Sequence, residues 1–373
     1  MQSSKGTTRI DSPRVASAQR VACLGESLVL LPHLPDDDAD GPMGRAEKGT
    51  LAGAEANVAA GLAGMDVPVA WVGRLGADAL GEFLHTDLQR RGVDVRAVQF
   101  DPDRPTGYYA KEVVTDETGE PRSHMLYRRA GSAASAMAPA FLDDPTVNDV
   151  LAGADLIHSS GITAALSASC AALMRTLLSR PRRFGATMSF DVNWREHLWP
   201  GGDPGLIVEL SRLADIVLVG GDEALRVFGT DDPQSIRKAL PEPDWIIVKD
   251  GARRALVLGR DDAVVEQPAL TVEVVEPVGA GDAFAAGFLG GVFRGDDMNR
   301  CLRRGHLSAG AVLTVAGDSA SLPADDVVDS LLDAAPETWA QTRVSAAGFT
   351  APSGLGQVGE PRSAEPSSVR NRR

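Results

Sequence analysis

The run Gly279-Ala280-Gly281-Asp282 combines a flexible turn with a carboxylate, and a helical segment follows it directly. Gly279 and Gly281 permit a tight turn and let a ligand approach the backbone amides. Apolar side chains recur at helical spacing over 282–293, so we expect a helix that starts at Asp282. Free N–H groups at a helix N-terminus favour anions, and a carboxylate beside them can accept a proton from a hydroxyl group. The combination suits transfer of a phosphoryl group to an alcohol.

The same four residues are also typical of an ordinary junction in which an aspartate caps a helix. The apolar stretch 270–275 comes just before the run, which is the context that the chemical interpretation requires. A Gly-x-x-x-x-Gly-Lys-Ser/Thr loop is absent, and the first strand–helix turn has no Gly-x-Gly-x-x-Gly. The sequence also contains neither His-Glu-x-x-His nor Gly-x-Ser-x-Gly. A P-loop kinase and a nicotinamide dehydrogenase are therefore disfavoured.

Strands and helices alternate along most of the chain. We expect strands near 156–158, 186–191, 216–219 and 245–249, separated by helices near 167–180, 204–213 and 233–240. Before them we expect a strand region at 21–31 broken at 25–27, a helix at 54–64, a strand at 67–72 and a helix at 79–91. This order predicts an α/β fold with a mostly parallel sheet covered by helices on both faces. Ligands bind at the carboxyl edge of such a sheet, where polar and glycine residues follow each strand here.

Some segments do not follow this alternation of strands and helices. Residues 106–129 have the pattern of a β-hairpin with a turn at 116–121, and a hairpin outside the main sheet suggests a lid. We expect one domain over 20–335, a disordered extension at 1–19 and a disordered tail at 346–373, which is rich in Gly, Pro and Ser.

Composition excludes several classes of partner. The chain has 373 residues and a formal net charge of −14, and no Lys/Arg-rich block lies within the expected fold, so nucleic acid is not an expected partner. No apolar run reaches the length of a membrane span. The three cysteines are widely scattered, without metal-binding spacing, which fits a reducing cytoplasm.

Two segments resemble the signatures of one family. The run from Val278 to Phe288 resembles the C-terminal signature of the ribokinase-like (PfkB-type) carbohydrate kinases, and Gly73 to Gly81 resembles their N-terminal signature, Gly-x-x-Gly-x-Asp-x-x-Gly. The resemblance covers about 20–332. It implies a three-layer ribokinase-like sandwich with a small β-lid at about 31–52 and 104–129. It also implies that Asp282 is the catalytic base and that Gly279, Ala280 and Gly281 form the anion hole.

Within that family, the runs 128–135, 160–166 and 191–199 resemble the 2-keto-3-deoxygluconate kinases. Arginines beside a sugar pocket make sense if the acceptor carries a carboxylate, and we assign Arg128 and Arg195 to it. Tyr109 and Tyr127 would supply an apolar wall with hydroxyl groups. The acceptor-binding residues expected on this basis are Glu26, Gly53, Asn57, Tyr109, Tyr127, Arg128, Ile162 and Arg195. A solvated or purely structural role remains open for Glu26, Asn57, Arg128 and Arg195.

The nucleotide side carries weaker signals. We expect ATP to contact Lys249, Gly251, Gly279, Gly281 and Asp318, with Mg²⁺ near Glu223. The family commonly has Asn-x-x-Glu at the metal-bound phosphates, whereas this chain has Gly220 in place of the asparagine and keeps Glu223. Glu276 also stands where the family usually has an aspartate.

The resemblance therefore predicts an ATP-dependent, Mg²⁺-requiring sugar kinase, and the acceptor that fits best is 2-keto-3-deoxygluconate, converted to its 6-phosphate. A kinase for a neutral sugar such as fructose or ribose, or for a nucleoside, remains open. So does a sugar-acid binding protein that has lost catalysis. We expect a cytoplasmic homo-oligomer that pairs through its lid.

Overall fold

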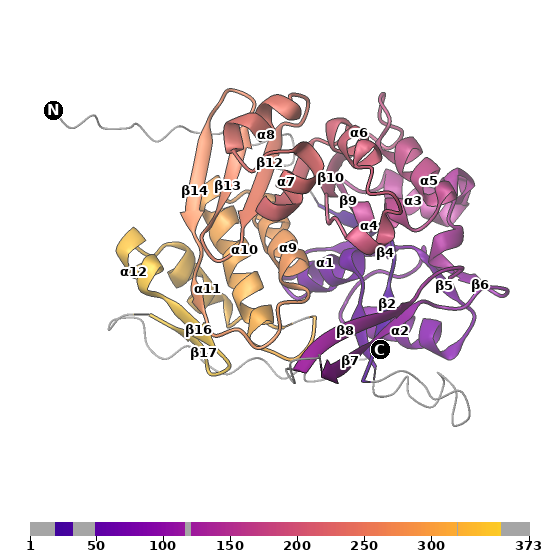
Figure 1. The fold of residues 1–373 in the computed structure, drawn as a ribbon, viewed down its shortest axis with the longest axis horizontal. Coiled ribbons are helices and arrows are strands. Elements are labelled where there is room, and N and C mark those ends of the chain that lie inside the picture. Colours follow the sequence, from indigo (N-terminus) through magenta and orange to yellow (C-terminus); the bar gives the residue numbers. More distant parts are fainter. Residues whose placement is uncertain (1–18, 33–48, 116–120, 319, 352–373) are drawn as a thin grey trace, which may run out of the picture.

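The computed structural model describes residues 19–32, 49–115, 121–318 and 320–351, which form layers of helices around a central sheet (Figure 1). The sheet has eight strands in the order β14-β13-β12-β11-β10-β9-β1-β4. Their bounds are β1 Val21–Leu24, β4 Val69–Val72, β9 Leu156–Ser160, β10 Thr187–Asp191, β11 Ile216–Gly220, β12 Trp245–Asp250, β13 Arg254–Gly259 and β14 Val264–Pro268. The strands from β4 to β12 are parallel, as expected, while β13 and β14 continue antiparallel. The sequence analysis did not anticipate these last two strands.

Helices cover both faces of the sheet, so alternate residues of a strand enter different cores. In β1, Val21 and Cys23 pack into one cluster, whereas Ala22 and Leu24 pack into the other. The first cluster includes α1 (Ala54–Ala63), α2 (Ala79–Arg90), α9 (Ala280–Arg294) and the start of α10 (Met298–Leu313). The second includes α3 (Pro145–Ala152), α4 (Gly161–Ala165), α5 (Ala168–Leu178), α6 (Gly205–Leu213), α7 (Gly221–Phe228) and α8 (Pro233–Ala239). The expected three-layer α/β sandwich is therefore confirmed.

A separate four-stranded sheet forms the expected β-lid. Its strand order is β3-β2-β7-β8, from β2 (Leu28–Leu31), β3 (Thr50–Ala52), β7 (Tyr108–Thr115) and β8 (Pro121–Arg128). The antiparallel pairing of β7 with β8 confirms the hairpin, and Leu28, Ala52 and Tyr109 form a small core of their own. The remainder of the predicted lid segment, 33–48, lies outside the described residues.

The fold continues beyond its predicted end. Helices α11 (Asp325–Leu332) and α12 (Pro336–Gln341) precede β16 (Arg343–Ser345) and β17 (Gly348–Thr350). These strands join β15 (Thr271–Val272) in a three-stranded sheet in which Phe349 is buried. The prediction of a disordered tail from residue 346 was thus wrong for 346–351, because Val344 and Phe349 bury their side chains beside Trp339. The rest of the predicted tail and the predicted extension at 1–18 lie outside the described residues.

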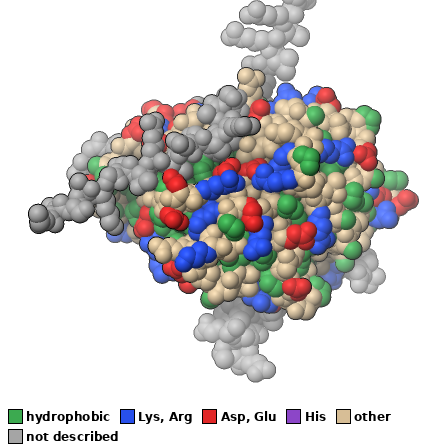
Figure 2. All heavy atoms as spheres, turned by 90° about the horizontal axis from the view of Figure 1, so that it is seen from above, with side chains coloured by type: hydrophobic (Ala, Val, Ile, Leu, Met, Phe, Trp, Pro, Cys, Tyr) green, Lys and Arg blue, Asp and Glu red, His purple; other side chains and the backbone are tan. Residues whose placement is uncertain are grey.

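Charge on the described surface is mixed in sign. In the view from above, Lys and Arg side chains lie among Asp and Glu side chains (Figure 2). Many of these charges form ion pairs, such as Arg180 with Asp215 and Arg260 with Asp244. Among the described helices, none is long and apolar enough to cross a bilayer.

Candidate active site

The glycine turn lies at the carboxyl edge of the sheet and starts α9, as expected. Gly279 caps the helix with φ of 81°, a left-handed conformation that side chains disfavour. A Cβ atom at Gly279 would also lie 2.9 Å from the backbone oxygen of Asp318. Both the backbone conformation and the close neighbour therefore require glycine here, and the first amides of α9, beside Asp282, have no hydrogen-bond partner within the helix.

Two amide side chains hold the Asp282 carboxylate. Asn57 of α1 donates from Nδ2 to Oδ2 at 2.9 Å, and Asn193, which follows β10, donates from Nδ2 to Oδ1 at 3.3 Å. Burial raises the pKa of Asp282 to about 6, against the opposing effect of the Asn57 hydrogen bond. The carboxylate is thus held in place and is a better proton acceptor than an exposed aspartate.

The lid reaches this carboxylate through a short polar chain. Tyr109 of β7 donates its hydroxyl to Asp318 Oδ2 at 3.0 Å, and Asn57 also hydrogen-bonds Asp318. Burial raises the pKa of both Tyr109 and Asp318. Asn57 therefore links the lid contact to Asp282.

An arginine and a glutamate lie on the inner side of the lid. Arg129 Nη2 is 3.3 Å from Glu26 Oε2, and only 11% and 1% of the two side chains are exposed. The Arg129 guanidinium lies 4.5 Å from the ring centroid of Tyr127, which stacks on Tyr109 at 5.0 Å between centroids. Burial raises the pKa of Glu26, although Arg129 opposes the shift. These groups form a polar cluster with an aromatic wall, which Tyr109 connects to Asp282 through Asp318 and Asn57.

Several buried polar atoms near Asp282 have no protein partner, although polar groups in a protein interior normally find one. Among the described residues these atoms are Glu26 Oε1, Asn57 Oδ1, Asp191 Oδ1, Asn193 Oδ1 and Arg129 Nε. Their number and mixture of donors and acceptors indicate a site for a polyhydroxylated ligand.

A cavity of about 490 Å³ opens on the other side of Asp282. Its polar end is lined by Lys249, Glu223, Asn193 and the α9 start at 280–282. Its apolar end is lined by Leu270, Val272, Val274, Phe284, Ala309 and Leu313. Charged groups beside a glycine turn, together with an apolar wall, suit a nucleotide.

The charged side chains of Lys249 and Glu223 at the polar end already contact other groups of the protein. Lys249 Nζ lies 2.7 Å from Asp191 Oδ2. Glu223 Oε1 accepts from Arg195 Nη1 at 3.3 Å, and Glu223 Oε2 accepts from the Gly220 amide at 2.7 Å. Burial raises the pKa of Glu223, with Lys249 opposing the shift.

Comparison with known proteins agrees with this arrangement. Residues 18–325 match the pfkB family of carbohydrate kinases. The chain belongs to that family. It is 32% identical over 297 residues to the 2-dehydro-3-deoxygluconokinase of Bacillus subtilis, covering 76% of this chain and 87% of that protein. The corresponding enzyme of Thermoproteus tenax is also 32% identical, over 76% of this chain and 86% of that protein.

Solved structures have the same fold. The PfkB protein from Polaromonas sp. JS666 superimposes with a TM-score of 0.66 and 30% identity, over 81% of this chain and 98% of that chain. A fructokinase from Xylella fastidiosa with bound ATP has a TM-score of 0.68 and 24% identity, over 84% of this chain and 97% of that chain. The ribokinase-like fold and the carbohydrate kinase family predicted from the two signatures are confirmed, so the chain is a sugar phosphotransferase.

Most of the predicted site residues lie together in this kinase. Asn57 hydrogen-bonds Asp282 directly, and Asp318 links Asn57 to Tyr109. Gly53 precedes α1 with its backbone against Glu26. Ile162 is buried in α4, next to the carboxyl end of β9. Lys249, Gly251, Glu223 and Arg195 all line the 490 Å³ cavity.

Two predicted residues lie elsewhere. Arg128 is exposed and faces away from Tyr127 and Arg129, because side chains alternate across a strand. Arg129 takes the inner position, and the sequence analysis missed it. The alternation itself was the available signal, since an inward Tyr127 implies an outward Arg128 and an inward Arg129.

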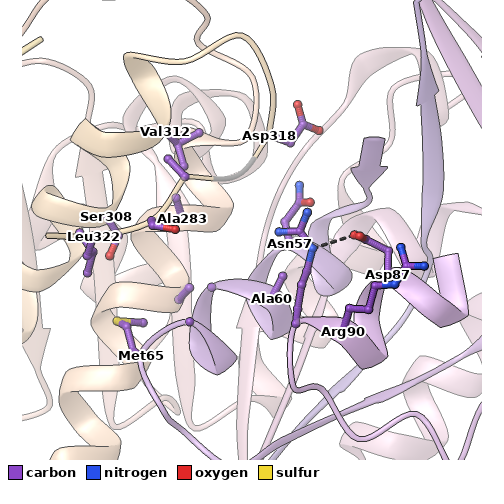
Figure 3. Close-up of a pocket in the computed structure, with 16 residues that line it drawn as sticks. Asn57, Ala60, Met65, Asp87, Arg90, Ala283, Ser308, Val312, Asp318 and Leu322 are labelled. Carbon is purple, nitrogen blue, oxygen red and sulfur yellow. Dashed lines mark hydrogen bonds and ion pairs between the residues drawn. The ribbon is translucent and has the colours of Figure 1, made fainter. Parts of the chain in front are cut away.

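Asp318 was expected at the nucleotide but does not line the 490 Å³ cavity. It lines a second cavity of about 650 Å³, between α1, α2, α9 and α10, where it lies on the same side as Asn57 (Figure 3). The other walls include Ala60, Met65, Arg90, Ser308 and Leu322. Asp318 therefore lies beside Asn57, and its hydrogen bond with Tyr109 connects it to the lid.

Proposed function

We propose that the protein phosphorylates the terminal hydroxyl of 2-keto-3-deoxygluconate with ATP, giving the 6-phosphate. The observation that carries the proposal is the position of Asp282, which contacts buried polar side chains with unpartnered atoms and also lines a nucleotide-sized cavity. The names of the relatives from Bacillus subtilis and Thermoproteus tenax support the choice of acceptor.

In the proposed reaction, Asp282 accepts the proton of the acceptor hydroxyl as that oxygen attacks the γ-phosphorus of ATP. The new bond joins the acceptor oxygen to phosphorus, the bond from phosphorus to the β–γ bridging oxygen breaks, and ADP leaves. The amides of Gly279, Ala280 and Gly281 stabilise the negative charge that develops on the transferring group. Asn57 and Asn193 hold the Asp282 carboxylate in line with the hydroxyl.

Arg129 is the basis for the proposed preference of the enzyme for an acceptor that carries a carboxylate. Its guanidinium is nearly buried and pairs with Glu26 through Nη2, whereas its Nε atom has no partner among the described residues and can donate to an acceptor carboxylate with little competition from water. Arg195, at the rim between Asp282 and Glu223, is the second arginine in the proposal. Glu26, Gly53, Asn57, Tyr109, Tyr127 and Ile162 complete the acceptor pocket in this proposal.

ATP binds with its phosphates toward Lys249 and the α9 start, and with its base toward Leu270 and Val272 in the apolar end of the cavity. Mg²⁺ neutralises phosphate charge when bound and prefers phosphate oxygens, water and few carboxylates. Glu223 is the carboxylate at the polar end, and both its oxygens already accept hydrogen bonds. Since the described residues hold no cluster of three acidic, His or Cys ligands, Glu223 fits an indirect role in holding the metal.

Pairing of two copies through the lid is part of the proposal, because β3 and β8 are the edge strands of the lid sheet in the part of the chain that the structure describes. A cytoplasmic location is also proposed, and it is supported by three cysteines that are free and buried.

The proposal is tested by measuring ADP release over a panel of sugar acids, neutral sugars and nucleosides. The expected result is the highest kcat/KM for 2-keto-3-deoxygluconate. An equal or higher kcat/KM for fructose or ribose would show that 2-keto-3-deoxygluconate is not the preferred acceptor. Binding of acceptors without ADP release would contradict the kinase assignment.

A further inference from the structure

Lys249 occupies a place in this site that the family signatures do not explain. Its Nζ atom lies 3.7 Å from the point where a Cβ atom on Gly281 would be, so the ammonium group is beside the second residue of the glycine turn. Only 17% of the Lys249 side chain is exposed, and that part lines the 490 Å³ cavity next to Asp282. A cation at this position lies beside the turn whose amides would receive the transferring phosphoryl group.

The neighbouring strand has a glycine beside Lys249. Gly220, at the end of β11, pairs directly with Lys249 of β12 in the parallel register. Gly220 is also the residue that replaces the asparagine of the Asn-x-x-Glu pattern. The donor side chain that is missing from β11 thus has a cationic donor directly beside it on β12.

We propose that Lys249 binds the γ-phosphoryl group of ATP and stabilises its charge in the transition state, and that Asp191 is the positioning residue that aims the ammonium group. This inference rests on the proposed function, because it assumes that ATP occupies the 490 Å³ cavity.

Asp191 is suited to that role because it fixes the lysine without blocking it. Asp191 ends β10, its side chain is 3% exposed, and its Oδ2 accepts from Lys249 Nζ at 2.7 Å. An ammonium group has three donors, so two remain for phosphate oxygens. Asp191 Oδ1 has no partner in the described structure, which leaves Lys249 as its principal contact.

The charges around the lysine favour its protonated form. Asp191 of β10, Glu223 of α7 and Asp282 of α9 all act on Lys249 as anions, while the buried His158 of β9 is held neutral by desolvation. In the step itself, Lys249 remains protonated throughout and transfers no proton. The proton of the acceptor hydroxyl goes to Asp282, and the electron pair of the broken phosphorus–oxygen bond leaves on ADP.

The test compares Lys249→Met, Lys249→Arg and Asp191→Asn with wild type, and uses Lys238→Met as the matched control. Lys238 is an exposed lysine of α8, before β12 begins. For each variant, kcat is measured by ADP release, and dissociation constants are measured for ADP and for an ATP analogue with an imido β–γ bridge. Only the analogue carries a γ-phosphoryl group.

We expect Lys249→Met to lower kcat about 10²-fold, the usual effect of removing one donor to developing charge. The same variant should weaken the analogue about 10-fold relative to ADP, since one charge-assisted hydrogen bond is lost. Lys249→Arg should recover part of kcat, and Lys238→Met should match wild type.

Asp191 is tested through a double variant. If Asp191 acts through Lys249, Asp191→Asn lowers kcat in the wild-type background and adds no further loss to Lys249→Met. The double variant also removes both buried charges together, so it avoids the unpaired carboxylate that the single Lys249→Met change leaves.

Unchanged kcat in Lys249→Met, or equal weakening of ADP and of the analogue, would overturn the role of Lys249. An additive loss in the double variant would overturn the positioning role of Asp191. Wild-type protein that binds neither nucleotide would instead refute the proposed function, so the two failures are distinguishable.

Discussion

Replacing Asp282 by asparagine removes the charge of the proposed base while the size of the side chain stays the same. An asparagine cannot accept the hydroxyl proton, so we expect kcat to fall on the order of 10²-fold or more. The Oδ1 atom of the new side chain can still accept from Asn57 Nδ2, which lies 2.9 Å from the native Oδ2, while the longer 3.3 Å bond from Asn193 is lost. The fold should therefore survive.

The same change should make the protein more stable at neutral pH. Burial raises the pKa of Asp282 to about 6 from 3.8, so the folded state disfavours the charged form. Each pKa unit corresponds to about 1.4 kcal/mol, which gives at most about 3 kcal/mol of lost stability near pH 7.5. The folded protein binds the proton more tightly than the unfolded chain, so this loss develops as pH rises from about 4 to about 6. The extra stability of the Asp282→Asn variant over wild type should therefore be about half as large near pH 5 as near pH 7.5.

Urea or thermal unfolding at the two pH values checks the stability difference, and ADP release checks turnover. The wild-type kcat should fall as pH drops below about 6, because Asp282 becomes protonated. The desolvation argument would be refuted if the stability difference between the variant and wild type were no larger near pH 7.5 than near pH 5. Near-normal turnover would refute the role of Asp282 as the base.

Three further predictions test other parts of the site. Arg129→Met should raise the KM for a sugar acid by about 10-fold or more and leave the KM for neutral sugars unchanged. Substitution of the exposed Arg128 by methionine should change neither KM, and steady-state kinetics with both classes of acceptor measures the difference. Gly279→Ala should lower kcat and destabilise the fold by about 1–3 kcal/mol, as measured by urea unfolding, because φ is 81° and Asp318 blocks the Cβ position. Trp339→Ala should cost about 3–5 kcal/mol and raise KM for ATP, since Trp339 is fully buried and its ring is near His306 in the cavity wall.

The fold was predictable because its signals are local. Alternating strands and helices fix a parallel sheet, and the glycine turn fixes the start of α9. The strands at β13 and β14 were missed because a short antiparallel hairpin at a sheet edge interrupts the expected order of strands and helices. Residues 346–351 were missed because Gly, Pro and Ser dominate the chain after them, while the burial of Phe349 also depends on residues far away in the sequence, such as Leu270 and Leu307.

The site was less predictable because its contacts join distant parts of the chain. Tyr109 and Asp318 are 209 residues apart, and no spacing rule links a lid strand to the loop after α10. The choice between Arg128 and Arg129 was different, because the alternation of side chains along β8 contains that information. The pairing of Lys249 with Asp191 follows from the order of the strands, since β12 and β10 flank β11.

The way in which Asp282 is held explains how one carboxylate can be both fixed and reactive. Hydrogen bonds from Asn57 and Asn193 stabilise the charged form, yet burial outweighs them and the pKa still rises to about 6. A carboxylate has about four acceptor positions, so two amide donors orient it and leave room for the acceptor hydroxyl. Stronger donors such as arginines would fix it equally well but would lower its pKa and weaken it as a base. Amides from α1 and from the end of β10 therefore give orientation at a small cost in proton affinity, which is the balance that a general base requires near neutral pH.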